Sequence, residues 1–218
     1  MKNIVNISVR LILIILFISL FSCATTPEVQ PERKEQIIEM GSYSVSVPPN
    51  KSFGKFFGKW DIKMDNGKRT VAFRMVRRNP LSGEFADTTL IQVWQNTIKP
   101  EGWHLSEEEI ANDYRRMEEK IMKEEGVEKG QYKLENLKWD TITLGTKKLY
   151  TMNYTKLIGK TLGGFTEKAT LFLYFPPDFN KNHDFYMFLL SFLYTSGAVR
   201  TFYPTEEVHY IINSFQQK

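Results

Sequence analysis

Apolar and polar positions alternate with a period of two along much of the first half of the chain. Residues 42–47 read Ser-Tyr-Ser-Val-Ser-Val and are followed by two prolines, which predicts a strand with a defined end. Residues 60–64 and 69–77 alternate in the same way, and Asn66-Gly67 between them is a strong hairpin signal. Residues 88–98 are again strand-like. An antiparallel meander is the economical topology for such neighbouring runs.

A helical period replaces this alternation in residues 107–125. Ser106 and Glu109 have the spacing of a capping box, which satisfies backbone donors at a helix start, and Gly126 is placed to end the helix. The face that carries Arg115 is expected to be solvated. The opposite face has one apolar stripe, which predicts packing against a core and consists of Ile110, Tyr114, Met117 and Ile121.

The second half of the chain adds strands and a final helix. Two alternating runs flank a turn at Gly145, and residues 168–175 and 185–194 are apolar on both faces, which suits central strands covered above and below. Residues 205–215 have the apolar spacing of a helix that packs on the sheet. We therefore predict an α+β fold, with one antiparallel β-sheet flanked by helices, in a single domain over residues 41–218.

The N-terminal segment is uncharged and mostly apolar from Leu11 to Phe21, and Cys23, the only cysteine of the chain, follows two positions later. With Lys2 and Arg10 upstream it has the n-region and h-region of an export signal. The segment resembles a bacterial lipoprotein signal, although Phe21 is bulkier than that family usually places there. An uncleaved anchor and an ordinary secretory signal remain as alternatives; the apolar run is shorter than the roughly 20 residues of a spanning helix.

The lipoprotein resemblance implies a covalent lipid on Cys23 and removal of the signal peptide, residues 1–22. The lipid bilayer is then the first partner, because two or more acyl chains give stable attachment. In the lipoprotein sorting pattern, an aspartate directly after the lipidated cysteine retains the protein in the inner membrane. This chain has Ala24 there, which points to the outer membrane, facing the periplasm. Residues 23–40 read as a flexible tether that adds at most one helical turn at its end.

Charge and composition do not indicate a particular partner. The chain is formally +4, and loss of Lys2 and Arg10 with the signal leaves the mature part near +2. This modest balance, together with export, argues against nucleic acid. With one cysteine, stability must come from a core and not from an intramolecular disulfide, and the aromatic content of 14% can supply that core.

Short motifs of the globular part resemble the PsbP-like superfamily, which includes a subunit of the oxygen-evolving complex and many bacterial relatives. They are Tyr43-Ser44-Val45-Ser46-Val47-Pro48, the helix start at Ser106, the late apolar strands and Ile211-Ile212-Asn213-Ser214-Phe215. The resemblance implies an α/β/α sandwich. The chain departs from the family in residues 53–60 and in its long loops, and no functional residue carries over.

The sequence shows no recognisable catalytic or metal-binding motif. His104, His183 and His209 are isolated, without the spacing of a zinc site, and no cofactor other than the lipid is expected. With Cys23 lipidated, no cysteine nucleophile remains. A carboxylate pair formed only by folding, for example around Asp87 or Glu101, leaves an envelope polymer-modifying hydrolase as the alternative function.

We expect a non-enzymatic binding or accessory module with an envelope protein as partner. Its predicted contact surface combines aromatic side chains with cations, which are the residues that anchor interfaces. For the cations the main alternative is a solvated sheet edge blunted by charge, and the minority one is contact with anionic lipid or polymer. The surface consists of Phe53, Lys55, Phe56, Phe57, Lys59, Trp60, Arg74 and Arg77.

Overall fold

The structure is a computed structural model that describes residues 36–49, 58–78, 83, 85–159, 164–195 and 203–218. Its strands are β1 (Ile37–Glu39), β2 (Tyr43–Ser46), β3 (Asp61–Met64), β4 (Thr70–Arg78), β5 (Phe85–Thr97), β6 (Tyr132–Leu144), β7 (Lys147–Ile158), β8 (Phe165–Tyr174), β9 (Asp184–Thr195) and β10 (Gln216–Gln217). Its helices are α2 (Glu107–Met122), α3 (Phe179–Asn182) and α4 (Thr205–Ser214), with a 3-10 turn, η1 (Pro100–Gly102), and a π-turn, η2 (Lys123–Val127).

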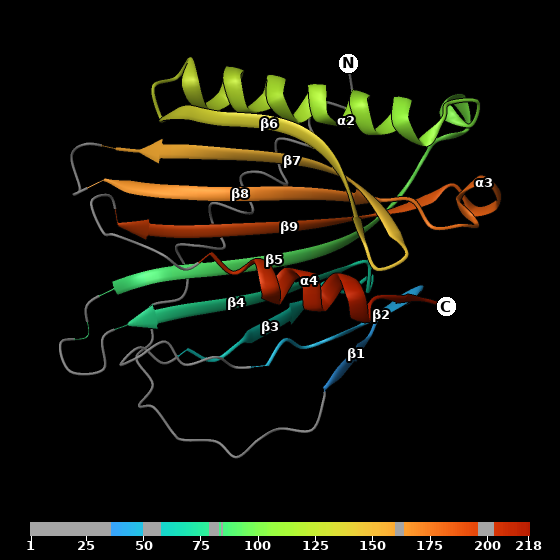
Figure 1. Cartoon of the computed structure of the whole chain (residues 1–218), viewed down its shortest axis with the longest axis horizontal. Helices are drawn as coiled ribbons and strands as arrows, with labels where there is room; N and C mark the ends of the chain where they lie inside the picture. Colours follow the sequence, from blue (N-terminus) through green and yellow to red (C-terminus); the bar gives the residue numbers. More distant parts are fainter. Residues whose placement is uncertain (1–35, 50–57, 79–82, 84, 160–163, 196–202) are drawn as a thin grey trace. The chain divides into compact units, whose positions relative to one another are not determined.

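Seven strands form one antiparallel sheet in the order β3-β4-β5-β9-β8-β7-β6 (Figure 1). Strands β3, β4 and β5 pair in chain order at one end of the sheet, and β6 to β9 pair in chain order from the other end. As a result, β9 lies in the middle beside β5. This confirms the predicted α+β fold class and the antiparallel meander. The prediction of one sheet is wrong, because β1, β2 and β10 form a second, three-stranded antiparallel sheet.

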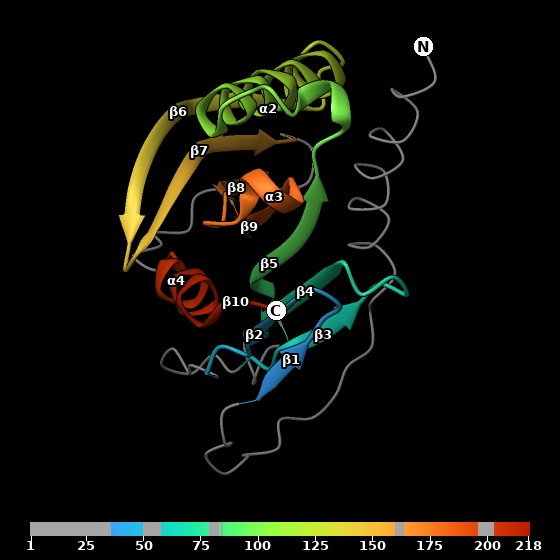
Figure 2. The same cartoon turned by 90° about the vertical axis from the view of Figure 1, so that its right-hand side faces the viewer.

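The first part of the central strand β9, Phe185–Phe188, is covered on both faces, as its sequence predicts. Tyr186 and Phe188 lie in a core that α4 and the small sheet cover, whereas Phe185 and Met187 lie in the core beneath α2 (Figure 2). Each of these four side chains is at most 7% exposed. Leu189, which continues the α2 side, is only half-buried, so the prediction that residues 185–194 are covered above and below is wrong at this position.

The folded part begins before residue 41. Residues 37–39 form β1 and not a helical turn, and they pair with β2 in antiparallel register. Ile38 and Met40 are buried in the α4-side core. The four residues of β2 are all buried, because that strand is the middle one of its sheet and packs directly over the core. Residues 36–40, assigned above to the tether, thus belong to the domain.

The α2 helix begins as predicted, with the capping box of Ser106 and Glu109 complete. It continues into η2 before it ends, so Gly126 lies within the π-turn. Arg115 is buried and not solvated: its Nη2 donates to the Asp140 carbonyl of β6, and its guanidinium lies 5.5 Å from the Tyr150 ring centre. None of the helices that the structure describes is long and apolar enough to cross a bilayer.

Candidate functional site

Arg77, predicted as a contact residue, is buried in the sheet. Its Nε donates to Oδ1 of Asp87 on β5 over 2.6 Å, and the two side chains are 5% and 3% exposed. Alternation along β4 places Arg77 on the same side as Val71, Phe73 and Met75, which face the α4-side core. The guanidinium is therefore compensated by a carboxylate on the neighbouring strand, and its prediction as an exposed contact is wrong.

Trp60 is also inside the domain. It is 7% exposed and belongs to the α4-side core, so it does not form part of a surface. Just before it, Gly58 lies tight against β4: a Cβ built there would be 2.5 Å from Cγ of Met75. Lys59 is exposed. The remaining predicted site residues lie outside the described part of the chain, and they are Cys23, Phe53, Lys55, Phe56 and Phe57.

Arg74 is the predicted contact residue that marks a distinct surface. It lies on β4 opposite Leu90 of β5, which in turn lies opposite Ser191 of β9. One ladder step along, Gln92 of β5 lies opposite Leu189 of β9. All of these side chains point to the α2 side of the sheet and are half-buried. We call this surface the open sheet face, and it consists of Arg74, Val76, Leu90, Gln92, Leu189 and Leu193.

The open sheet face exists because α2 covers only part of its side of the sheet. The helix packs over the β6–β7 end, where Ile110 and Ala111 lie against Tyr150 and Met152 (Figure 2). Among the described elements, no helix makes extensive contact with β4 or β5. In addition, no donor in the described residues reaches Oε1 of Gln92, which is shielded from solvent.

A polar network borders the open sheet face on β7, β8 and β9. Ser191 Oγ donates to Glu167 over 2.6 Å, and the Lys156 ammonium lies 3.6 Å from the other oxygen of that carboxylate. The ammonium also lies about 5 Å from the ring centres of Tyr132 and Tyr154, which suits a cation. Burial, and secondly the Glu167 charge, raise the pKa of Tyr154. Since Ser191 donates to a carboxylate already paired with a cation, this network is structural in character.

Sequence reasoning missed both the open sheet face and this polar network. Glu167 and Lys156 are cross-strand neighbours, and Ser191 lies one ladder step away, although the three are distributed over 36 positions of the chain. The alternation of apolar and polar residues along β5 could have indicated the open sheet face, but only with the knowledge that β9 is the neighbour of β5.

The enzymatic alternative allows a carboxylate pair around either Asp87 or Glu101; these two residues lie far from each other, and Asp87 pairs with Arg77. Asp87 lies near the start of β5 and Glu101 in η1 beyond its end. A strand rises about 3.3 Å per residue, so the two are separated by roughly 35 Å along β5. In the described residues, no group of three or more histidine, cysteine, aspartate or glutamate side chains is placed to hold a metal ion.

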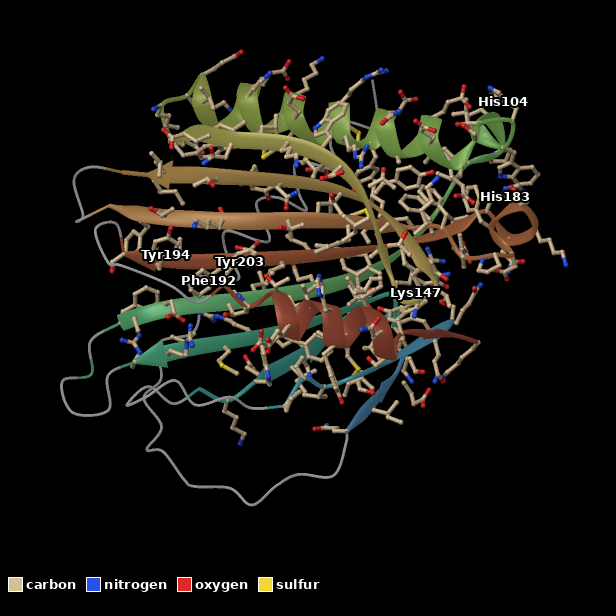
Figure 3. All side chains as sticks on the ribbon, in the orientation of Figure 1. His104, Lys147, His183, Phe192, Tyr194 and Tyr203 are labelled. Atoms are coloured by element: carbon tan, nitrogen blue, oxygen red, sulfur yellow. The ribbon has the colours of Figure 1, made fainter. Side chains whose placement is uncertain are left out.

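The histidines occupy separate environments. His183 stacks on Trp103, with ring centres 4.2 Å apart, at the end of the sheet where His104 also lies (Figure 3). His209 of α4 packs edge-on against Phe172, and burial lowers the pKa of its imidazole. Phe192, Tyr194 and Tyr203 gather toward the opposite end of the sheet, where the Tyr203 hydroxyl lies 3.1 Å from Thr170 Oγ1. None of these places a histidine beside a nucleophile.

Comparison with known proteins yields a structural likeness. No protein-family model and no curated protein matches the chain. Among solved structures, it is similar to the solution structure of the cyanobacterial PsbP protein CyanoP from Synechocystis, with 14% sequence identity and a TM-score of 0.48. The superposition covers 91% of this chain and 99% of that one. PsbP is the family that the sequence motifs resemble; a similarity of this degree carries no information on activity or partners.

Proposed function

We propose that this protein is a lipid-anchored, non-enzymatic binding module of the bacterial cell envelope. Lipidation at Cys23 holds it at the outer membrane on the periplasmic side, and an envelope protein binds to the open sheet face. The sequence observation behind the anchor is an export signal that ends at the only cysteine of the chain.

The open sheet face is the observation that supports binding. Its apolar members, among them Leu90, Leu189 and Leu193, are half-buried on adjacent strands and form a contiguous surface. Arg74 adds a cation to this surface. Contiguous apolar surface with an arginine and few other charges is the composition of protein interfaces and not of ordinary solvated surface. Residues 53–57, outside the described part of the chain, stay predicted contact residues.

The anchor is tested by intact mass. We expect the mature protein to begin at Cys23 and to carry the added mass of at least two acyl chains. Cys23→Ala should fractionate as a soluble or unprocessed protein, with Ser22→Ala as the matched control that keeps the thiol. A mature protein without acyl mass would refute the anchor.

The binding surface is tested by site-specific photo-crosslinking in cells. A crosslinker at Leu90 should capture one protein, whereas a crosslinker at the exposed Lys129 should not. Leu189→Glu places a charge on the open sheet face and should abolish the Leu90 crosslink while the fold, followed by circular dichroism, is retained. Equal capture from both positions, or capture that Leu189→Glu leaves intact, would show that the open sheet face is not the binding surface. Turnover of an envelope polymer by the purified protein, abolished by substitution of a carboxylate, would overturn the non-enzymatic assignment.

A further inference from the structure

The apolar stripe of α2 is not the side of the helix that is buried. Of the stripe, only Ile110 is buried, whereas Tyr114, Met117 and Ile121 are half-buried. Met117 and Ile121 pack against neither of the two cores. The other buried residues of the helix each follow a stripe residue by one position, which is about 100° around the helix axis, and they are Ala111, Arg115 and Met122. We call Tyr114, Met117 and Ile121 the α2 stripe.

The contacts of two neighbouring residues show which way the α2 stripe points. The Arg115 guanidinium lies 5.8 Å from the ring centre of Trp139 on β6 and 5.5 Å from that of Tyr150 on β7. The Tyr114 ring packs instead edge-on against Phe185 of β9, with ring centres 6.1 Å apart. Because β9 lies beyond β7 and β8 in the order of the sheet, the α2 stripe points toward the middle of the sheet.

The open sheet face continues from the place where Tyr114 meets β9. Leu189 and Leu193 follow Phe185 along β9 on the same side of the sheet, because every second side chain of a strand shares a side. Figure 1 shows α2 running along the strands and in the same direction as β9. The α2 stripe is about 10 Å long and the distance from Leu189 to Leu193 is about 13 Å. The two apolar surfaces therefore adjoin over about two helical turns.

The dimensions and the residue spacing suit one additional helix. Of the described strands, α2 contacts β7 most extensively, and β9 lies two strands farther, which is about 10 Å. Neighbouring helices pack about 8–10 Å apart, so a helix beside α2 would lie over β9. The alternating spacing of three and four residues in the α2 stripe is also the pattern of a seam between two helices.

The charges that border this position compensate each other. The Lys156 ammonium and the Glu167 carboxylate, on β7 and β8, lie 3.6 Å apart, and their side chains are 16% and 20% exposed. The network that they form with Ser191 is satisfied within the domain. An occupant over β9 therefore needs an apolar face and no matching charge at this place.

We propose that the partner presents an amphipathic α-helix that lies beside α2 over β9. One side of its apolar face packs on the α2 stripe, and the other side packs on the open sheet face. This inference rests on the proposed function and specifies which element the envelope protein contributes. Helices that bind in this way use apolar anchors spaced three, four and seven positions apart.

Crosslinkers at two adjacent residues of α2 test the arrangement. Met117 belongs to the α2 stripe, whereas Arg116 is exposed and is the matched control. In cells, a photo-crosslinker at Met117 should capture the same protein as one at Leu90, and one at Arg116 should not. The partner residues joined to Met117 and Leu90, identified by mass spectrometry, should lie in one segment, within about three helical turns of each other.

A synthetic peptide with the sequence of that segment tests for the helix. It should bind to the purified lipidated protein in detergent with a gain in the helical signal of circular dichroism. A proline at the centre of the peptide should weaken binding on the order of 100-fold. Met117→Glu should weaken binding at least about tenfold, because the complex would bury an uncompensated charge. Arg116→Ala makes the same change in net charge on the exposed side of α2 and should leave binding unchanged.

The outcomes separate this inference from the proposed function. Capture from Leu90 without capture from Met117, or equal binding of the proline peptide, would overturn the partner helix and leave the open sheet face as the binding surface. Crosslinks from Met117 to a second copy of this chain or to a lipid would also overturn it. Capture from neither Leu90 nor Met117 would refute the proposed function, and the partner helix with it.

Discussion

Replacing Asp87 by asparagine removes the carboxylate that faces the buried guanidinium of Arg77. The two groups are 2.6 Å apart on β4 and β5, with side chains 5% and 3% exposed. Asparagine has nearly the same shape and keeps an acceptor for the Nε–H. The substitution therefore removes a charge, with little change in packing.

The magnitude follows from the balance between attraction and desolvation. Two unit charges about 4 Å apart attract by about 4 kcal/mol at an effective dielectric constant near 20. Burial costs several kcal/mol for each ion, so the pair contributes little net stability, but removal of one partner costs about 3–5 kcal/mol. Because the amide retains a hydrogen bond, we expect Asp87→Asn to cost about 3 kcal/mol. That corresponds to a fall in melting temperature of about 6–12 °C for a domain of this size.

Urea unfolding followed by tryptophan fluorescence measures this cost, with the slope m as the check on two-state behaviour. The double variant Arg77→Met with Asp87→Leu replaces both ions by apolar groups and should be more stable than Asp87→Asn. Arg78→Met, at the exposed neighbour, should change the free energy of unfolding by less than about 0.5 kcal/mol. A cost below about 1 kcal/mol for Asp87→Asn, or a double variant less stable than the single one, would refute the assignment of a buried, mutually compensating pair.

Three further predictions concern the core, the helix cap and the response to alkali. Phe172→Ala should cost about 3–5 kcal/mol in urea unfolding and Leu189→Ala about 1–2 kcal/mol, because only Phe172 is fully buried; equal costs would contradict the half-exposed position of Leu189. Ser106→Ala should lower the free energy of unfolding, measured by thermal unfolding, by about 1 kcal/mol through loss of the capping box, and Ser106→Asp should restore most of this loss. Burial raises the pKa of Tyr203 from 10.0 to about 12, so between these pH values the unfolded chain releases a proton that the folded one keeps. The stability that Tyr203 contributes is therefore complete below pH 10 and falls by about 1.4 kcal/mol per pH unit up to pH 12; the stability of Tyr203→Phe should fall less steeply with pH, and identical slopes would exclude this tyrosine as a cause.

Local patterns in the sequence were sufficient for most of the secondary structure and for the fold class. The alternation of β4 reports which residues share a face, since successive side chains of a strand point to opposite sides. The consecutive apolar residues from Phe185 to Leu190 in β9 indicate a strand covered on both faces, and Ser106 with Glu109 marks the start of α2. Each of these signals depends on residues within a few positions of one another, so one sequence suffices to read them.

The candidate site depended on pairings that no local pattern contains. Alternation places Arg77 with the apolar residues of β4, but only the register against β5 shows that Asp87 compensates it. The small sheet requires β10, at the end of the chain, to pair with β2 near its beginning. A half-apolar strand face has the same sequence pattern whether or not a helix covers it. The open sheet face could therefore be recognised only after the structure showed α2 over the β6–β7 end. Sequence thus determined which residues of a strand share a side, whereas tertiary structure decided what lies opposite them, because burial and charge compensation are set by neighbours distant along the chain.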